Sequence, residues 1–365
     1  MLATLEARTP ATRDRAIDGL RALALLGVVI GHWLVMPLIP DASGALHVSS
    51  PLRALPAFAP VSWMLQMLGL FFLVGGYVAA RGYRGGYRPW LRTRLLRLGR
   101  PVLALAVALA AGLPLLYLCG VPAGTLRTTL VLTVQPLWFL GVYAVVTALT
   151  PVIVALVRRF GVLAAVPPVL VVAAVDLLRY GPWQHAVPGW VGLVNVLPGW
   201  AFGYVLGVAW AYGRLGRRAA ALLAAGGGVL ALLLVARFGY PVSMVGVPGS
   251  ARTNSHPPSL LVVALAAAQC GLAVLLRDRL AALLRRPAWW GAAVLVNLGA
   301  LTILCWHQIA GVLVAGAAQL VARHAVTGLH TVPGGPVWIL ERLAWLPAYL
   351  IVLAGIVAAA RRFEK

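Results

Sequence analysis

Apolar residues run through this chain in long continuous stretches that do not alternate with polar ones. A helix needs about 20 mostly apolar residues to cross a membrane. Spanning strands would use about ten residues of alternating character, so strands are excluded. We therefore predict an all-α, polytopic membrane bundle of about ten transmembrane helices. The predicted stretches cover residues 19–39, 58–80, 100–118, 135–157, 160–178, 190–212, 219–237, 257–276, 292–321 and 337–360.

Two of these stretches are marked by an internal proline pair or by unusual length. The stretch 160–178 contains Pro167 and Pro168, and 292–321 is long enough to tilt or to break. The composition agrees with the pattern, because 62% of the 365 residues are hydrophobic and only 10% are charged. Charged groups this sparse cannot cover a water-facing surface of this size, so an ordinary soluble globular protein is excluded.

The chain is strongly basic, with 30 Lys and Arg against 8 Asp and Glu and a net charge of +22. Such a charge would suggest nucleic acid in a soluble protein, but in a membrane protein its placement sets the orientation. Alternate loops receive 23 and 7 of the cations. We therefore predict a multi-pass cell-membrane protein with both termini cytoplasmic and no nucleic acid partner. The expected organisation is a tail at 1–17, one transmembrane domain at 18–360 and a tail at 361–365.

The first apolar stretch carries three ionisable residues, Asp18, Arg21 and His32. Asp18 and Arg21 are neighbours on a helix, and His32 lies eleven residues after Arg21, about 20° beyond three full turns. The three side chains therefore share one stripe, with His32 about 16 Å deeper in the membrane. A buried neutral histidine is a natural general base for a hydroxyl. The alternative is an interfacial Asp18–Arg21 ion pair and a His32 that only hydrogen-bonds a neighbouring helix.

A second cluster lies between residues 81 and 100, where seven arginines occur within twenty residues. Arg94, Arg97 and Arg100 follow one another at helical spacing, and we call these three the arginine row. The row is predicted to lie at the cytoplasmic membrane surface. Guanidinium groups suit phosphates such as those of coenzyme A, whereas attraction to anionic lipid headgroups is the alternative.

A second intramembrane histidine, His307, lies in the late segment Leu304–Gln308. Two such histidines either converge on one cavity, bind a metal, or act as separate structural hydrogen-bonders. A metal is disfavoured because acidic residues are few and no metal-ligand spacing is present. The three cysteines, Cys119, Cys270 and Cys305, are read as buried apolar side chains. We predict no metal site.

Several short motifs occur in order along the chain: Arg15–Ala24 followed by His32, Phe71–Tyr77, the pair Arg94 and Arg97, Pro136–Leu140, and Leu304–His307. With these motifs the chain resembles the acyltransferase family 3 membrane proteins, which O-acylate sugars, cell-surface glycans and some macrolides. Gly75 stands where the family usually has Ser, and the aromatic of the last motif is shifted.

The resemblance implies an acyl-CoA donor substrate, no bound cofactor, and transfer to a hydroxyl of a sugar-containing acceptor. His32 would be the catalytic base, and Arg21, with Asp18 beside it, would orient the base or the donor. The arginine row would hold donor phosphates, while His307 and Trp138 would line the acceptor cavity. An acyl-His32 intermediate is an open alternative. The rival functions are a transporter or flippase that uses the same polar stripe, and a scaffold subunit.

Overall fold

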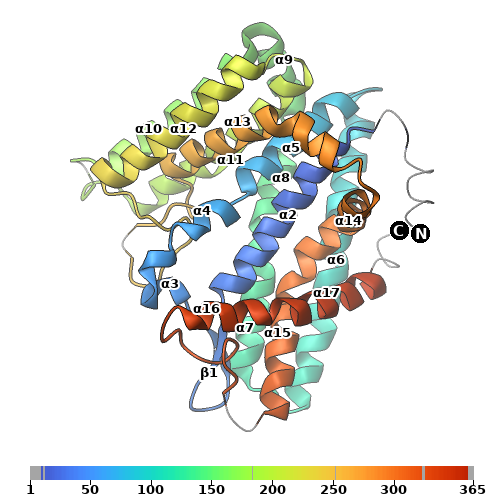
Figure 1. Ribbon diagram of the computed structural model, residues 1–365, viewed down its shortest axis with the longest axis vertical. Coiled ribbons are helices and arrows are strands. Elements are labelled where there is room, and N and C mark those ends of the chain that lie inside the picture. Colours follow the sequence, from blue (N-terminus) through green and yellow to red (C-terminus); the bar gives the residue numbers. More distant parts are fainter. Residues whose placement is uncertain (1–9, 11–12, 183, 251, 323–324, 361–365) are drawn as a thin grey trace. The chain divides into compact units, whose positions relative to one another are not determined.

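The computed structural model describes residues 10, 13–182, 184–250, 252–322 and 325–360, and most of them are helical (Figure 1). Ten helices among these residues are long and apolar enough to cross a membrane, which confirms the predicted all-α, polytopic class. They span Arg15–Val35, Pro56–Gly82, Tyr87–Leu118, Ala123–Ala148, Thr150–Tyr180, Gly189–Ala211, Arg217–Phe238, Leu260–Leu283, Ala300–Val321 and Val337–Ala360.

The chain divides into two compact units. Unit 1 comprises the described residues up to Gly27, Pro60–Arg92 and Val142–Leu298, and unit 2 comprises Val28–Ala59, Thr93–Gly141 and the described residues from Gly299 onward. Three helices contribute residues to both units: α2 (Arg15–Val35), α6 (Tyr87–Leu118) and α8 (Trp138–Ala148).

Unit 1 is a bundle in which α5 packs along α11 and α12 lies beside α13 (Figure 1). Its further elements are α4 (Val61–Leu65), α5 (Leu68–Gly82), α9 (Thr150–Phe160), η3 (Gly161–Ala165), α10 (Val166–Tyr180), η4 (Gly189–Asn195), α11 (Val196–Ala211), α12 (Arg217–Phe238), α13 (Leu260–Leu283) and α14 (Pro287–Leu298). Glycine permits the closest approach. A Cβ added at Gly76 would lie 2.0 Å from the Tyr204 carbonyl oxygen, and one at Gly207 would lie 1.9 Å from the Leu73 carbonyl oxygen. Small residues thus let α5 and α11 pack backbone to backbone, as membrane helices often do.

A buried carboxylate joins three segments of unit 1. Asp176 on α10 is 2% exposed and accepts hydrogen bonds from Asn195 Nδ2, Tyr240 Oη and the backbone N–H of Leu260. Burial, and then the negative charge of Asp176, raise the pKa of Tyr240, so this phenol stays a donor. The Leu260 N–H is the first backbone N–H of α13, and a carboxylate at this end of a helix also interacts favourably with the helix dipole. Asp176 therefore fixes how α13 begins against α10.

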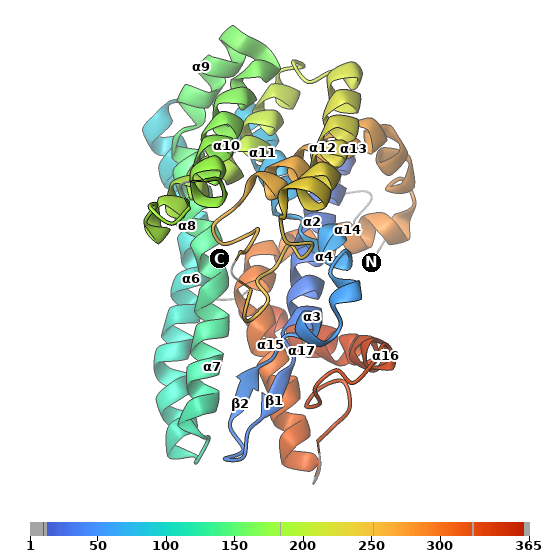
Figure 2. The ribbon, with the colours of Figure 1, turned by 90° about the vertical axis from the view of Figure 1, so that its left-hand side faces the viewer.

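Unit 2 is centred on α15 (Ala300–Val321), which packs against α7 (Ala123–Val134) and α17 (Leu346–Ala360). Beside α7 lies an antiparallel hairpin of β1 (Leu38–Pro40) and β2 (Leu46–Val48), in which Leu38 pairs with Val48 (Figure 2). The Leu46 N–H donates to Thr125 Oγ1 of α7, and Gln319 Nε2 of α15 donates to the Gly44 carbonyl. The remaining elements are α3 (Pro51–Ala54), η1 (Pro56–Phe58), η2 (Gln135–Leu137) and α16 (Val337–Ala344).

The prediction of one helix over 135–157 is wrong. That span begins twelve residues earlier at Ala123, turns through the 3-10 segment η2 at Pro136, and ends at Ala148. Polar residues in α7 hid its start from a hydropathy reading. Thr129 and Thr133 are buried, and their hydroxyls donate to the carbonyls of Thr125 and Thr129, four residues back. A threonine that satisfies its hydroxyl within its own helix lies in an apolar surrounding at little cost.

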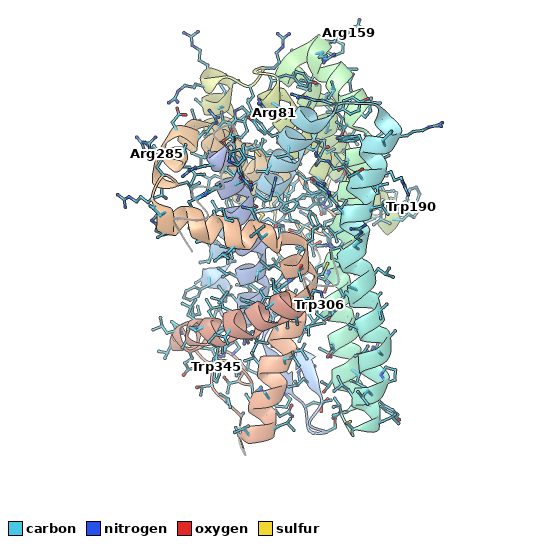
Figure 3. The ribbon with its side chains drawn as sticks, turned by 90° about the vertical axis from the view of Figure 1, so that its right-hand side faces the viewer. Arg81, Arg159, Trp190, Arg285, Trp306 and Trp345 are labelled. Carbon is cyan, nitrogen blue, oxygen red and sulfur yellow. The ribbon has the colours of Figure 1, made fainter. Side chains whose placement is uncertain are left out.

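Other boundaries also differ from the predicted stretches: the span predicted at 100–118 begins at Tyr87, and the span predicted at 160–178 begins at Thr150. The long stretch 292–321 breaks between α14 and α15 at Gly299, which fulfils the second of its two predicted outcomes, a tilt or a break. Helix α2 ends at Val35, not at residue 39, because Pro37 cannot continue it and the hairpin begins at Leu38. Arg81 and Arg159 lie at the same end of unit 1 in Figure 3. Both belong to the 23 cations that alternate loops place on one predicted membrane face, and the cytoplasmic identity of that face stays a prediction.

Candidate active site

The two intramembrane histidines meet in unit 2. His32, near the end of α2, and His307, on α15, approach with Nδ1 and Nε2 2.7 Å apart. The ring planes differ by 14° and the centroids are 5.0 Å apart. Stacked rings would keep their atoms about 3.5 Å apart, so a 2.7 Å contact between nearly parallel rings is an in-plane hydrogen bond. We call His32 and His307 the histidine pair.

The hydrogen bonds of His307 determine the tautomer of both rings. His307 Nδ1 lies 2.8 Å from the Leu304 carbonyl oxygen, and a carbonyl only accepts, so Nδ1 carries the proton. His307 is fully buried, at 0% exposed, where a charged ring is strongly disfavoured. Its Nε2 is therefore the acceptor, and His32 Nδ1 donates to it. This leaves Nε2 as the basic nitrogen of His32.

The pair differs in access. His307 is enclosed, whereas His32 is only half-buried. The enclosed ring can orient its partner, and the half-buried ring can reach a substrate. In hydrolase triads a carboxylate accepts the Nδ1–H of the catalytic histidine and so orients it. Here the neutral imidazole of His307 takes the place of that carboxylate and orients His32.

Further contacts tie the end of α2 to α15. Trp33 Nε1 donates to the His307 carbonyl oxygen at 2.9 Å, and Gln308 Nε2 approaches Met36 Sδ at 3.3 Å. Trp33 itself is 2% exposed. These bonds hold the backbone on both sides of the histidine pair.

Asp18 and Arg21 lie in unit 1, where they form the ion pair expected from their spacing. Arg21 Nη1 is 3.7 Å from Asp18 Oδ1, and the two side chains are 29% and 10% exposed. Asp18 also receives Arg13 Nε at 2.6 Å, and Asn297 Nδ2 donates to its backbone carbonyl. The carboxylate therefore secures the first turns of α2. The catalytic roles of Asp18 and Arg21 stay predictions.

The arginine row lies on α6, in unit 2, and is helical as predicted. Arg94 is half-buried, whereas Arg97 and Arg100 are exposed. Exposed guanidinium groups in a row suit anions such as phosphates. Whether that anion is a donor phosphate stays a prediction.

Trp138 is the first residue of α8, directly after η2, and is half-buried. Because η2 packs against α15, the start of α8 at Trp138 lies near the helix that carries His307. On α15 itself, Trp306 is drawn in Figure 3, and its indole Nε1 has no hydrogen-bond partner among the described residues. The acceptor-cavity role of His307 and Trp138 stays a prediction.

Gly75, where the resembled family usually has Ser, faces Tyr143. A Cβ added at Gly75 would lie 2.5 Å from Tyr143 Cε2 and 2.9 Å from Tyr143 Oη. The Tyr143 phenol thus occupies the space beside α5 that a serine side chain would need. The motif change is explained by this neighbour in unit 1.

Sequence reasoning did not single out three residues that matter here. Asp14 Oδ2 accepts from Arg277 Nη2 at 2.9 Å and from Tyr77 Oη at 3.2 Å, so it ties the start of α2 to α13 and α5. Tyr77 is the last residue of the Phe71–Tyr77 motif, and this motif was the sequence signal for the contact with Asp14. Trp33 directly follows His32. Arg342 was considered only as one of the 7 cations of the less basic loops, although a cation inside an apolar stretch is itself a signal.

No group of three or more His, Cys, Asp or Glu side chains in the described part of the chain could hold a metal ion. The histidine pair is also too close to share one. Two imidazoles bound to the same zinc each lie about 2.0–2.1 Å from it, which sets their nitrogens wider apart than 2.7 Å.

The sequence of this chain matches a family model. No curated protein and no solved structure matches the chain. The sequence model of the acyltransferase 3 family, described as an acyltransferase domain, matches residues 14–361. This match covers nearly the whole chain, including the histidine pair, the ion pair on α2 and the arginine row. The chain therefore belongs to the acyltransferase 3 family.

Proposed function

We propose that this protein is an integral membrane O-acyltransferase that moves an acyl group from acyl-CoA to a hydroxyl of a sugar-containing acceptor, with His32 as general base. Family membership and ten apolar helices support a membrane acyltransferase. The observation that carries the finer proposal is the histidine pair. It presents an imidazole oriented by a hydrogen bond at a half-buried position, as a general base for acyl transfer to a hydroxyl needs.

The proposed reaction uses both nitrogens of His32. Nε2 takes the proton of the acceptor hydroxyl as its oxygen attacks the thioester carbonyl carbon. The carbon–sulfur bond then breaks, and the departing thiolate takes the same proton from the imidazolium. During these steps Nδ1–H stays bonded to His307 Nε2, and this bond stabilises the charged ring while it exists.

The donor is proposed to reach the protein through its phosphates. The exposed Arg97 and Arg100 and the half-buried Arg94 form a cationic surface on α6 that suits the phosphates of coenzyme A. Arg21 is proposed to orient the donor or the base, with Asp18 holding its side chain. No bound cofactor takes part.

The test uses purified protein in liposomes, supplied with acyl-CoA thioesters of increasing chain length and with octyl glucoside as a sugar acceptor. Mass spectrometry detects acylated glucoside, and a thiol reagent measures released coenzyme A. A permethylated glucoside without hydroxyl groups is the matched control acceptor. Thiol release that requires the free hydroxyls is expected. His32→Ala should lower the rate on the order of 10²- to 10⁴-fold.

Two results would overturn the proposal. One is a His32→Ala protein that is monodisperse and transfers acyl groups at the wild-type rate. The other is intact thioester with every donor when the acceptor panel is extended to lipid-linked sugars and glycosylated macrolides, which would favour the transporter reading.

A further inference from the structure

A buried arginine lies next to the histidine pair in unit 2 and is unused by the proposed chemistry. Arg342, on α16, is 3% exposed. Its guanidinium donates to three backbone carbonyls: Trp33 at 2.8 Å, Gly328 at 2.9 Å and Met36 at 3.4 Å. Within the described part of the chain it forms no ion pair with a carboxylate. A buried cation without a counter-ion is costly, so its carbonyl partners need an explanation.

Two of these carbonyls belong to the end of α2. The last carbonyls of a helix lack partners within it and carry the negative end of the helix dipole. The Met36 N–H bonds the His32 carbonyl at 3.1 Å, and Arg342 binds the next carbonyl, that of Trp33. The guanidinium therefore caps the carboxyl end of α2, one residue after His32.

The same guanidinium is linked to His307 through an aromatic stack. Arg342 lies over the Tyr349 ring at 5.2 Å, and Tyr349 packs on the Trp33 ring at 5.1 Å with 23° between the planes. Trp33 in turn donates to the His307 carbonyl oxygen. Arg342 thus secures the backbone directly after His32, and through Trp33 it is linked to the backbone of His307.

We propose that Arg342 is a positioning residue for acyl transfer, whose guanidinium fixes the carboxyl end of α2 and with it the hydrogen bond between His32 and His307. This inference rests on the proposed function, in which His32 is the base. A planar fork with several donors serves three carbonyls at once, and a lysine ammonium on its flexible stem does not hold them in the same geometry.

The kinetic test compares Arg342→Gln and Arg342→Lys with Arg127→Gln, an exposed arginine of the same unit. Misplacing a base by about 1 Å costs on the order of 10²-fold in rate. Arg342→Gln should therefore lower kcat about 10- to 100-fold while KM for acetyl-CoA changes less than about twofold. The kcat of Arg342→Lys should lie between those of Arg342→Gln and wild type, and the kcat of Arg127→Gln should match wild type. Added methylguanidinium should partly restore the kcat of Arg342→Ala.

A spectroscopic readout keeps the inference separate from the proposed function. The chain has 7 histidines, so 15N-histidine labelling gives a tractable spectrum in which His32→Ala and His307→Phe assign the pair. Arg342→Gln should remove the signature of the hydrogen bond between the two rings, and Arg342→Lys should weaken it. If His32→Ala is fully active, the proposed function falls while this spectrum still tests the positioning. If His32→Ala is inactive and Arg342→Lys has wild-type kcat and spectrum, only the positioning role falls.

Discussion

At its amino end, in unit 1, helix α2 is held by charges: Asp14 and Asp18 pair with arginines that are all at least 29% exposed. At its carboxyl end, in unit 2, the helix is held by neutral rings, an indole N–H and one guanidinium on backbone carbonyls. Charge pairs at a partly exposed site are replaceable, because water compensates for a lost partner. A buried pair has no such substitute. The carboxyl end is therefore where a single change should abolish chemistry.

The largest effect is expected at the buried end. His307→Phe keeps an aromatic ring but removes the acceptor of His32 Nδ1–H, so His32 loses its orientation and its tautomer. We expect kcat to fall on the order of 10²- to 10⁴-fold in steady-state thiol-release assays. Trp306→Phe on the same helix is the control and should stay near wild type. A His307→Phe enzyme with wild-type kcat would remove the distinction between the two ends.

The arginine row should affect binding of the donor and not the chemical step. Replacing Arg94, Arg97 and Arg100 together with Gln should raise KM for acetyl-CoA about tenfold, since exposed charge contacts contribute about 0.2–1 kcal/mol each. S-acetyl-pantetheine, which lacks the phosphates, should show little change. Arg218→Gln, which removes an exposed positive charge outside the row, is the control for the loss of charge. Equal losses with both donors would contradict phosphate binding by the row.

The charged end of α2 should show a smaller effect, and mainly on stability. Asp14→Asn weakens the bond to Arg277, whose side chain is 42% exposed, and the bond to Tyr77. The expected loss is about 1–2 kcal/mol in the free energy of unfolding, measured by thermal unfolding in detergent. kcat should change less than about fivefold. A loss of activity as large as that of His307→Phe would show that both ends serve the chemistry.

The smallest expected effect is a pH dependence of stability in unit 2. Burial lowers the pKa of His330, which donates through Nε2 to the Ala315 carbonyl, below its ordinary value of 6.5. Below pH 6.5 His330 therefore binds a proton in the unfolded chain but not in the folded chain, so stability falls as pH decreases. One such group costs about 1 kcal/mol or less between pH 6.5 and 5.5. His330→Gln should flatten this slope in acid unfolding experiments, whereas His185→Gln should not.

Sequence patterns predicted the helices because hydropathy depends only on local composition. Ten spans follow from runs of apolar residues, and the break in 292–321 was one of the two outcomes predicted from its length. The start of α7 was not predicted, because Thr129 and Thr133 are polar residues, although their hydroxyls donate to carbonyls of their own helix. Element boundaries are lost wherever a polar side chain finds a local partner.

The candidate site was predicted only where its residues share one helix. Spacing along α2 gave the Asp18–Arg21 ion pair. That His32 and His307 converge was one open alternative, since residues 275 apart in sequence are brought together only by packing. The role of Arg342 depends on three carbonyls from two segments of unit 2, and backbone acceptors carry no sequence signal.

A double-mutant cycle in kcat tests the central claim most directly, that His32 and His307 act as one catalytic unit. The cycle compares wild type, His32→Ala, His307→Phe and the double variant in liposomes under saturating donor. Residues that work as a unit give strongly non-additive losses. The account predicts that the double variant is no slower than His32→Ala alone. Losses that multiply, or a His32→Ala protein with wild-type kcat, would contradict it.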